Sequence, residues 1–434
     1  MKICIFEEDI DKIENLYPLT LTRPVFELKC GYTTLSERIT RNFEGEELCA
    51  SSATIYFFLR EYLVPTFKNR TGANVIDGNN LPELCASSAT DDFLFINGRW
   101  LMNKGELGID GPEEIGVCGE EVAYIRATQQ TIQSSLADTP EAFYSNLKAQ
   151  LPKKEIKATL ISYPWDLISN NPDAMIADFE FLGKKGVLGE FSELSTIYGG
   201  SEDDVYVAES AEVQPLVVLD VTHGPIFIDE GAVIFPHTRI EGPAYIGKDT
   251  RIVGGKIREG TSIGPVCRVG GEVEEAIIHG YSNKYHDGFL GHAYVGEWVN
   301  LGALTTNSDL KNDYTTVEVY VKGKLMDSDD TKVGCFIGDH TKTGLGTFFN
   351  TGTVVGVMSN VLPAGGLLPK LIPSFCIAHE GRFLRGRLKD LLATAKTAMG
   401  RRDVELTQED IQLFERLYEL TKEERNEWIK KTRR

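Results

Sequence analysis

Residues 226–252 read "IFIDEGAVIFPHTRIEGPAYIGKDTRI", and isoleucine recurs at every sixth position of this stretch. The five positions are Ile228, Ile234, Ile240, Ile246 and Ile252. A second run with the same spacing is Ile337, Thr343, Phe349, Val355 and Val361. A period of six matches neither the 3.6-residue period of an α-helix nor the two-residue period of a strand. It is the period of hexapeptide β-helices, so the pattern predicts a β-helix over residues 196–380.

In such a solenoid each short strand points one aliphatic side chain inward before the chain turns a corner. Three strands complete a triangular coil, and successive coils stack about 4.8 Å apart through backbone hydrogen bonds. The inward side chains of stacked coils then form one continuous core. Glycine follows many inward positions, as at Gly247 and Gly264, which suits a crowded corner.

The six-residue period is interrupted twice, and we interpret each interruption as a loop extruded from the solenoid. The first interruption covers residues 274–296, and the second covers residues 305–332. Rigid scaffolds commonly carry their functional residues on loops. We therefore expect the functional residues of the solenoid in or near these two segments.

The first 195 residues alternate short apolar runs with helix-like segments. The predicted strands are residues 2–6, 93–97, 122–127 and 158–165. The predicted helices are residues 33–43, 53–63 and 139–151. Alternating strands and helices indicate an α/β domain with a largely parallel sheet.

Residues 381–434 lose the six-residue period and show helical spacing instead. One predicted helical face holds Leu384, Leu388, Leu391, Leu392, Ala395 and Met399. Thr407 and Thr421 are each followed three residues later by an acidic residue, which predicts two further helix starts. The segment is basic, with fourteen Lys and Arg against ten Asp and Glu. It is either a cap on the solenoid or a binding surface.

Composition restricts the class of partner. The chain has 434 residues and a formal net charge of −19, which argues against nucleic acid or an anionic membrane as the main partner. Its eight cysteines include no CxxC pair, which favours a reducing compartment and argues against a disulfide framework or a zinc site. No apolar run approaches the roughly 20 residues of a membrane span. We expect a cytoplasmic protein that acts on small molecules.

Residues 282–312, "SNKYHDGFLGHAYVGEWVNLGALTTNSDLKN", resemble the acetyltransferase end of bifunctional N-acetylglucosamine-1-phosphate uridyltransferases. Members of that family join a Rossmann-like α/β nucleotidyltransferase domain to a left-handed parallel β-helix. The resemblance implies this architecture, with a C-terminal helical segment, and a homotrimer. It places His286 on the family's catalytic histidine. It also implies substrate-binding roles for Lys284, Asn300, Asn307 and Lys311.

A histidine suits acetyl transfer from coenzyme A to an amine. A base with a pKa near 7 can take the amine proton during attack on the thioester, and no covalent enzyme intermediate is needed. The alternative is that His286 is a solvated loop histidine. We expect His292 to be structural. The sequence departs from the family motif at Leu304, which stands where the family has glycine.

Residues 16–39, "LYPLTLTRPVFELKCGYTTLSERI", resemble the segment that follows the Gly-rich loop of sugar nucleotidyltransferases. The loop itself is absent, because "DIDKIEN" at residues 9–15 contains no glycine. In "FLFINGRWL", residues 93–101, Arg99 stands where the family has an Mg²⁺-binding aspartate. An arginine cannot ligate a metal but can contact a phosphate. The resemblance implies nucleotide binding by Arg23, Asn97 and Arg99, and Mg²⁺ binding by Asp9 and Asp11.

The resemblance implies acetylation of an aminosugar phosphate from acetyl-CoA, followed by formation of a UDP-N-acetyl sugar from UTP. Two alternatives remain open. The chain retains one activity only, or it is a non-catalytic scaffold that binds a sugar nucleotide. The sequence leaves the sugar, the nucleotide and the acyl group open.

Overall fold

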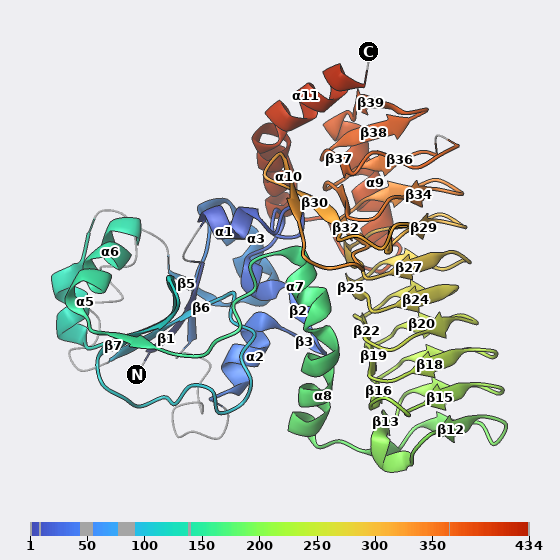
Figure 1. The fold of residues 1–434 in the computed structure, drawn as a ribbon, viewed down its shortest axis with the longest axis horizontal. Coiled ribbons are helices and arrows are strands. Elements are labelled where there is room, and N and C mark those ends of the chain that lie inside the picture. The colour runs from blue at the N-terminus through green and yellow to red at the C-terminus, as the bar shows by residue number, and fades with distance from the viewer. Residues whose placement is uncertain are drawn as a thin grey trace. The chain divides into compact units, whose positions relative to one another are not determined.

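The computed structural model describes residues 2–7, 10–43, 55–76, 92–137, 140–363 and 365–432 (Figure 1). The chain forms two compact units. The first unit comprises Met1–Glu14, Arg23–Leu28 and Thr33–Ser162. The second unit comprises Asn15–Thr22, Lys29–Tyr32 and Tyr163–Arg434.

The first unit is built on a seven-stranded sheet in the order β5-β4-β1-β6-β8-β7-β9. Its strands are β1 (Lys2–Phe6), β4 (Ile55–Phe58), β5 (Asn74–Ile76), β6 (Phe93–Asn97), β7 (Glu114–Cys118), β8 (Glu121–Ala127) and β9 (Lys153–Glu155). Strands β5, β4, β1 and β6 are mutually parallel, whereas β8 is antiparallel to both β6 and β7. The helices are α1 (Ile10–Glu14), α2 (Leu35–Arg41), α3 (Val64–Thr71), α5 (Gln129–Ser135) and α6 (Pro140–Gln150). The predicted α/β domain with a largely parallel sheet is confirmed.

Two predicted elements of this unit are wrong. The helix predicted at residues 53–63 is wrong for the described residues, because Ile55–Phe58 is strand β4, which pairs in parallel with β1. The run Ile-Tyr-Phe-Phe has strong β propensity, and pairing with a buried strand overrides its helix-like spacing. Residues 158–165 do not form a strand. Only Leu160 bridges to Trp100, and helix α7 begins at Pro164, a residue suited to the first turn of a helix.

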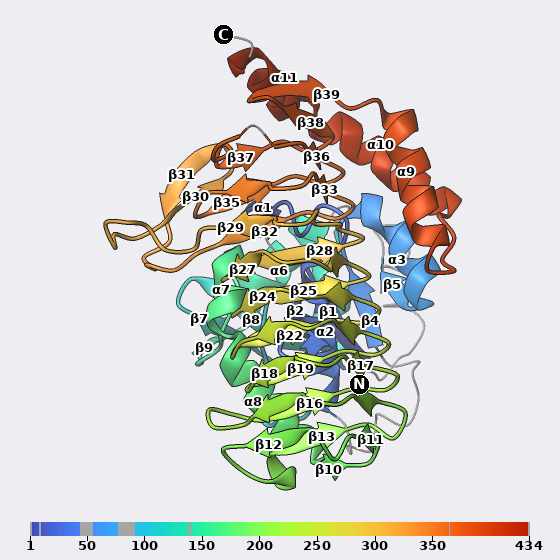
Figure 2. The same cartoon turned by 90° about the vertical axis from the view of Figure 1, so that its right-hand side faces the viewer.

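The second unit is a parallel β-helix with three sheets, and Figures 1 and 2 show its strands stacked coil upon coil. The first sheet holds β10 (Gly186–Val187), β13 (Val205–Val207), β16 (Ile226–Ile228), β19 (Ala244–Ile246), β22 (Thr261–Ile263), β25 (Ile277–Gly280), β28 (Tyr294–Glu297), β32 (Cys335–Ile337), β35 (Thr353–Val355) and β37 (Leu371–Ile372). The second sheet holds β11 (Glu190–Phe191), β14 (Glu212–Val213), β17 (Val233–Ile234), β20 (Arg251–Ile252), β23 (Arg268–Val269) and β26 (Asn283–Lys284). The third sheet holds β12 (Thr196–Tyr198), β15 (Val218–Asp220), β18 (Arg239–Glu241), β21 (Lys256–Ile257), β24 (Glu272–Glu274) and β27 (Phe289–Gly291).

Shorter groups of strands complete the described chain. They are β2 (Lys29–Cys30), β3 (Thr33–Thr34), β29 (Thr306–Asn307) with β34 (Phe348–Phe349), β30 (Glu318–Val321) with β31 (Lys324–Asp327), and β33 (Lys342–Thr343) with β36 (Asn360–Val361), β38 (Cys376–His379) and β39 (Arg382–Arg385).

The periodic isoleucines form the core of the β-helix. Ile228, Ile246, Ile263 and Ile278 lie in register on four successive coils of the first sheet. Their exposed fractions are 0 to 2%. The six-residue period therefore marks inward positions, and the predicted β-helix is confirmed.

One of the two predicted breaks is wrong. Across residues 274–296 the strands β25 to β28 continue the three sheets without an extruded loop. Ile278, Lys284 and Leu290 keep the spacing of six, but a lysine at an inward position hides it. The second break is confirmed, because β30 and β31 form an antiparallel hairpin outside the three sheets (Figure 2).

Helices α7 (Pro164–Ser169) and α8 (Asn171–Leu182) belong to the second unit. The Asn171 side chain donates to the carbonyl oxygen of Gly260 at 2.8 Å and accepts from the backbone N–H of Gly31 at 2.7 Å. The Asp178 carboxylate accepts from the backbone N–H of Tyr32 at 2.7 Å. The boundary at residue 195 rests on the onset of the six-residue period and stays a prediction.

The C-terminal helices are α9 (Leu388–Gly400), α10 (Gln408–Leu420) and α11 (Lys422–Lys431). Thr407 caps α10 in a reciprocal arrangement with Asp410, as predicted. Thr421 precedes α11 without a side-chain cap, because its hydroxyl donates to the carbonyl oxygen of Leu417. Leu384 is not helical but lies in β39, which pairs antiparallel with β38 at the end of the β-helix. Strand β39 and α11 contact each other, which fits the interpretation of a cap.

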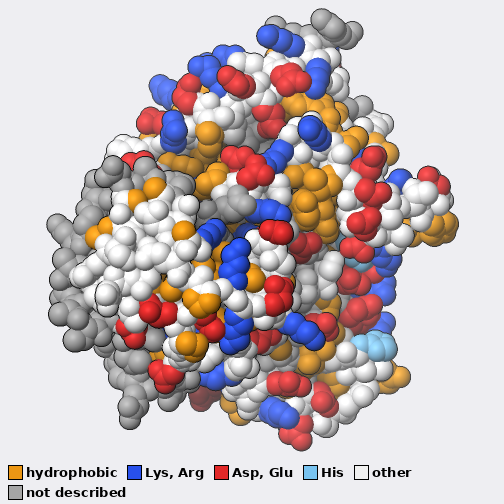
Figure 3. Space-filling view, turned by 60° about the vertical axis from the view of Figure 1, so that its left-hand side comes forward, with side chains coloured by type: hydrophobic (Ala, Val, Ile, Leu, Met, Phe, Trp, Pro, Cys, Tyr) orange, Lys and Arg blue, Asp and Glu red, His pale blue; other side chains and the backbone are white. Residues whose placement is uncertain are grey.

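In the described part of the chain, no helix is long and apolar enough to cross a lipid bilayer. Figure 3 shows one face, on which acidic and basic side chains are interspersed. On that face the negative charge of the chain is not gathered into one patch.

Candidate functional site

The outer face of the second sheet carries a column of polar side chains. Arg251, Arg268 and Asn283 lie in register on successive coils. Isolated bridges continue the column to Asn300 and then to Lys342. Because stacked strands are about 4.8 Å apart, the five side chains form one ladder along the β-helix.

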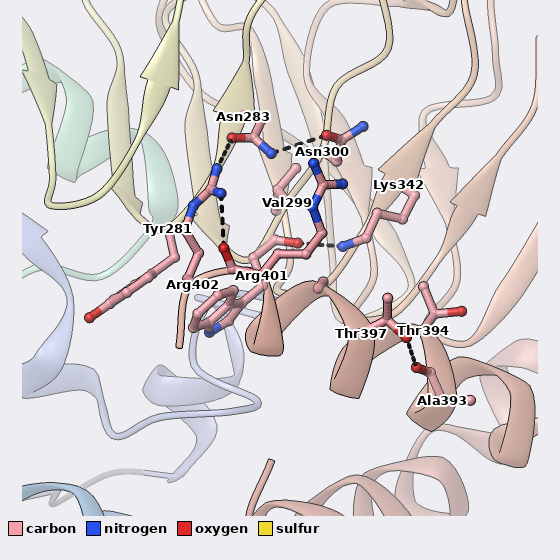
Figure 4. A pocket seen from close by; sticks show the side chains of 12 residues that line it. Tyr281, Asn283, Val299, Asn300, Lys342, Ala393, Thr394, Thr397, Arg401 and Arg402 are labelled. Carbon is pink, nitrogen blue, oxygen red and sulfur yellow. Dashed lines mark hydrogen bonds between the residues drawn. The ribbon is translucent and has the colours of Figure 1, made fainter. Parts of the chain in front are cut away.

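Two neighbouring cavities open onto this column beside the end of α9. The helix cavity, about 500 Å³, is lined by Tyr281, Asn283, Trp298, Val299, Asn300, Lys342, Ala393, Thr394, Thr397, Ala398, Arg401 and Arg402 (Figure 4). The arginine cavity, about 480 Å³, is lined by Phe235, Arg251, Val253, Arg268, Asn283, Tyr285, His286, Asn300, Leu301, Gly302, Ala303, Leu345, Arg401 and Arg402. Asn283, Asn300, Arg401 and Arg402 belong to both cavities, so the two form one candidate site.

His286 lies at the corner that follows β26, and its side chain is exposed. Its ring meets the Tyr285 ring edge-on, with 5.1 Å between centroids and an interplanar angle of 68°. The imidazole lines the arginine cavity. It is therefore accessible to a ligand in that cavity.

The arginine cavity is strongly cationic. Four arginines line it, and its described lining contains no Asp or Glu. The pKa of Arg268 is lowered by burial and by the neighbouring charges of Arg402 and Arg251. Arg402 donates to Oδ1 of Asn283 at 3.1 Å, while its Nε is buried and has no hydrogen-bond partner in the described structure. Clustered guanidinium groups are suited to phosphate.

The helix cavity combines aromatic rings with a buried amine. Tyr281 stacks on Trp298 with 4.4 Å between ring centroids. Nζ of Lys342 donates to the carbonyl oxygens of Trp298 and His340, and burial lowers the pKa of Lys342 to about 8. Figure 4 shows Arg401 and Arg402 reaching from the end of α9 toward Asn283 and Asn300. The cavity can therefore take a planar or apolar group next to an anion.

Lys284 lies inside the β-helix rather than in either cavity. Its side chain is 3% exposed. Nζ donates to the carbonyl oxygen of Gly270 at 2.8 Å and to that of His286 at 3.1 Å. Lys284 therefore holds the backbone at the corner that carries His286. The predicted direct contact with substrate stays a prediction.

The other residues expected to bind substrate are dispersed. Asn300 is exposed, lines both cavities and accepts from Nδ2 of Asn283 at 3.2 Å. Asn307 is buried, and its side-chain amide pairs with both the N–H and the carbonyl oxygen of Gly291. Lys311 lies in the extruded segment and donates to the carbonyl oxygen of Thr316. Of the three, only Asn300 is brought to the candidate site.

His292 fits the structural role expected for it. Its Nδ1 lies 2.8 Å from Oδ2 of Asp309, and its Nε2 lies 3.3 Å from Oε2 of Glu275. Burial alone would lower the pKa of His292, but the two carboxylates raise it to about 9. The imidazolium therefore ties the start of the extruded segment to the coil below it.

The first unit has a second polar group where β4, β1 and β6 end. Parallel strands place ligand sites at their carboxyl ends. There the Glu7 carboxylate accepts from Nε and Nη2 of Arg60, both at 3.0 Å, and from the backbone N–H of Val25 at 2.8 Å. Arg60 also donates to the carbonyl oxygen of Arg23, whose side chain is buried. Sequence analysis missed Glu7 and Arg60, because the strand before Arg60 was predicted as a helix.

Asn97 and Arg99 are engaged within the first unit. The Asn97 amide accepts from the backbone N–H of Arg99 at 3.0 Å and donates to the carbonyl oxygen of Val122 at 2.7 Å. The Arg99 guanidinium is 2% exposed, forms an ion pair with Glu121 and donates to the carbonyl oxygen of Ile161. A phosphate contact by Arg99 would require this ion pair to open.

The residues proposed for Mg²⁺ do not form a described site. Asp9 lies outside the described residues, and Asp11 is exposed on α1. Within the described ranges no three metal-binding side chains are grouped. The position of the family's aspartate holds a buried cation, Arg99, and the Asn97 oxygen is already bonded. These residues do not fit an Mg²⁺ site of the family's type.

Comparison with known proteins agrees with both units. Residues 3–186 match the family model "Sugar nucleotidyl transferase". The bifunctional sugar-1-phosphate nucleotidylyltransferase/acetyltransferase of Sulfurisphaera tokodaii is 36% identical over 92 residues, covering 21% of this chain and 23% of the relative. The bifunctional protein GlmU of Acidithiobacillus ferrooxidans is 32% identical over 163 residues, covering 36% of this chain and 33% of the relative.

A third relative matches over most of both chains. The bifunctional protein GlmU of Methanocaldococcus jannaschii is 26% identical over 385 residues, covering 80% of this chain and 90% of the relative. The first two relatives are matched over only 23% and 33% of their lengths. The chain is therefore similar to sugar nucleotidyl transferases over residues 3–186 and to this GlmU over most of its length.

Proposed function

We propose that this protein is a bifunctional transferase that acetylates an aminosugar phosphate on the β-helix and joins it to a nucleotide in the first unit. The acetyl donor is acetyl-CoA, the nucleotide is UTP, and the product is a UDP-N-acetyl sugar. The observation that carries the proposal is the exposed His286 on the wall of a cavity lined by four arginines. The names of the relatives, nucleotidylyltransferase/acetyltransferase and GlmU, support it.

The arginine cavity matches the chemistry of coenzyme A. A diphosphate and a ribose phosphate need several positive charges, which Arg251, Arg268, Arg401 and Arg402 supply in one cavity. The aromatic helix cavity adjoins it and accepts a planar or apolar part of the same ligand. The thioester group of a coenzyme A bound in these two cavities then lies beside His286.

In the acetyl transfer step, the amine nitrogen of the sugar attacks the thioester carbonyl carbon. His286 takes the amine proton as the C–N bond forms. The C–S bond then breaks, and the departing sulfur of coenzyme A receives that proton from His286 and leaves as the thiol. Asn300 orients the sugar through its amide. Lys284 acts through His286, since its Nζ holds the carbonyl oxygen of that residue.

Nucleotidyl transfer takes place at the carboxyl ends of β1 and β6. A phosphate oxygen of the sugar attacks the α-phosphorus of UTP, and pyrophosphate leaves. Arg23 and Arg99 neutralise phosphate charge once Arg99 is released from Glu121. The assay below measures whether Mg²⁺ is required.

The assembly we propose is a homotrimer, by resemblance to the family, in which a neighbouring copy completes the acyl site. The predicted cytoplasmic location stays a prediction.

A second candidate function is acetyl transfer alone. The missing Gly-rich loop and the ion pair of Arg99 with Glu121 favour it. In this case the first unit binds a sugar nucleotide without transferring it.

Two product assays on one preparation distinguish these functions. Thiol release is measured with acetyl-CoA and glucosamine 1-phosphate. Pyrophosphate release is measured separately with UTP and N-acetylglucosamine 1-phosphate, with and without Mg²⁺. We expect both products, and His286→Gln is expected to lower thiol release by about 10²-fold or more while leaving pyrophosphate release unchanged. His223→Gln, at an exposed histidine lower on the β-helix, is the matched control. Thiol release without pyrophosphate release supports acetyl transfer alone, and absence of both products overturns the proposal.

A further inference from the structure

Helix α9 turns one of its faces toward the helix cavity rather than packing it against the β-helix. The buried side chains of α9 are Ala395 and Met399. A different face lines the cavity, and its residues recur at helical spacing: Ala393, Thr394, Thr397, Ala398 and, just past the end of the helix, Arg401. In Figure 4 the threonines lie on α9, with Asn300 and Lys342 across from them on the β-helix. The cavity, about 500 Å³, is within the usual size range of ligand pockets.

The lining of the helix cavity is cationic. It holds Lys342, Arg401 and Arg402, and the described part of the lining contains no Asp or Glu. Arg401 is exposed, and its guanidinium forms no hydrogen bond or ion pair with the described residues. An accessible guanidinium of this kind can bond to a phosphate.

The two threonines of α9 offer hydrogen-bond acceptors to the cavity. Oγ1 of Thr397 donates to the carbonyl oxygen of Ala393 at 2.9 Å, and Oγ1 of Thr394 donates to that of Asp390 at 3.0 Å. A hydroxyl has one donor but two acceptor positions, so each oxygen can still accept a hydrogen bond. Both threonines are exposed. This face of α9 therefore suits a ligand that carries amino or hydroxyl groups.

The two cavities can hold opposite ends of one acyl donor. His286 lines the arginine cavity but not the helix cavity. With the thioester beside His286 and the diphosphate among the arginines, the far end of coenzyme A remains to be placed. That end consists of adenine, a ribose and a 3′-phosphate. The helix cavity adjoins the arginine cavity along a wall that both share, and it is the space into which this end can extend.

We propose, on the basis of the acetyl transfer proposed above, that the helix cavity binds the adenosine 3′-phosphate end of the acyl donor. Helix α9 thereby selects coenzyme A thioesters over donors that end at the phosphate of pantetheine. The adenine amino group and the ribose hydroxyl donate to Thr394 and Thr397. The 3′-phosphate bonds to Arg401.

The apolar part of the lining completes this subsite. Adenine contacts the stacked rings of Tyr281 and Trp298. Ala393 and Ala398 are small, so they leave the volume between α9 and the β-helix open. A large side chain at Ala398 would fill the space of the nucleoside without touching the arginine cavity, whose lining does not include this residue. Ala398 is therefore a specificity-determining residue for the donor.

The test compares two acyl donors on the full-length protein. Acetyl-CoA carries the nucleoside, whereas S-acetyl-4′-phosphopantetheine ends at the first phosphate. Thiol release with glucosamine 1-phosphate gives kcat/KM for each donor. Wild type is expected to prefer acetyl-CoA by about 100-fold or more, because contacts remote from the thioester contribute binding energy.

Two variants of α9 assign this preference to the helix cavity. Ala398→Phe is expected to lower the preference by about tenfold or more, through a higher KM for acetyl-CoA. Leu392→Phe, on the same helix but outside the cavity, is the matched control and is expected to keep the wild-type preference. Thr397→Val keeps the shape of its side chain and removes the hydroxyl, and it is expected to lower the preference about fivefold.

The outcomes separate this inference from the proposed acetyl transfer. No thiol release with either donor overturns the acetyl transfer and the inference together. Equal use of both donors by wild type overturns the inference alone. The same preference in Ala398→Phe and Leu392→Phe, with both variants folded by circular dichroism, also overturns it. If Ala398→Phe does not fold, a wild-type preference in Thr397→Val has the same consequence.

Discussion

Replacing Lys284 with methionine is the most informative perturbation of the β-helix, because a lysine there occupies a position that holds isoleucine or valine on the preceding coils of the second sheet. Its side chain is 3% exposed, and burial lowers the pKa of Lys284 from 10.5 to about 8. One pKa unit is worth about 1.4 kcal/mol. Keeping this amine charged inside the fold therefore destabilises the protein by about 3 kcal/mol at pH 7.

The pH dependence has a definite sign. The folded-state pKa lies below the unfolded value, so between pH 8 and 10.5 the unfolded chain binds more protons and stability rises with pH. From pH 7 to 9.5 this contributes about 2 kcal/mol to wild type. Lys284→Met removes that contribution and leaves the carbonyl oxygens of Gly270 and His286 without their donor. Each unpaired carbonyl costs about 1–3 kcal/mol at every pH.

The assay is urea unfolding of wild type and Lys284→Met at several pH values from 7 to 9.5. The free energy of unfolding of wild type, relative to the variant, is expected to rise by about 2 kcal/mol over this range. Lys256→Met, at a lysine on the outside of β21, is the control, and its difference from wild type is expected to stay constant. Parallel pH curves for wild type and Lys284→Met would refute the reasoning that the amine is buried in the corner beside His286.

Three further predictions concern other parts of the second unit. The pKa of His292 is raised to about 9, so its ion pairs stabilise the fold below pH 6.5 and this stabilisation is lost as pH rises through 9. In thermal melts His292→Gln should remove this pH-dependent loss of stability, and a variant with the same pH dependence as wild type would contradict the prediction. Thr407→Ala removes the N-terminal cap of α10 and should lower the free energy of unfolding by about 1 kcal/mol. Thr397→Ala, inside α9, is the control, and equal losses of stability in the two variants would contradict the capping role. Arg402→Gln should raise KM for acetyl-CoA about tenfold with kcat unchanged, since its loss removes one charge-assisted contact of about 1.5 kcal/mol, and a change confined to kcat would contradict this role.

The fold could be predicted from the sequence wherever buried positions hold apolar residues at regular spacing. Ile228, Ile246 and Ile263 predict the β-helix because each coil repeats the same inward geometry. The same logic fails at Lys284 and Asn307, which are buried polar residues at inward positions. Their hydrogen bonds to backbone groups of neighbouring coils replace apolar packing, and a pattern of apolar residues cannot reveal such bonds.

The candidate site could be predicted in part. The motif around His286 locates the histidine and Asn300, but Arg401 and Arg402 come from a helix about a hundred residues later, with no spacing rule to link them. In the first unit, Glu7 bonds to Arg60 and Arg99 bonds to Glu121 across separate strands. Such long-range ion pairs depend on sheet order, and the sequence prediction had Ile55–Phe58 as part of a helix.

The most direct test of the central claim is a structure of the protein with coenzyme A, supported by calorimetric titration of the same ligand. The account predicts binding along the second sheet, with the diphosphate bonded to at least two of Arg251, Arg268 and Arg402, and with the sulfur facing His286. Coenzyme A bound away from these arginines and His286, or no measurable binding in the titration, would contradict the account.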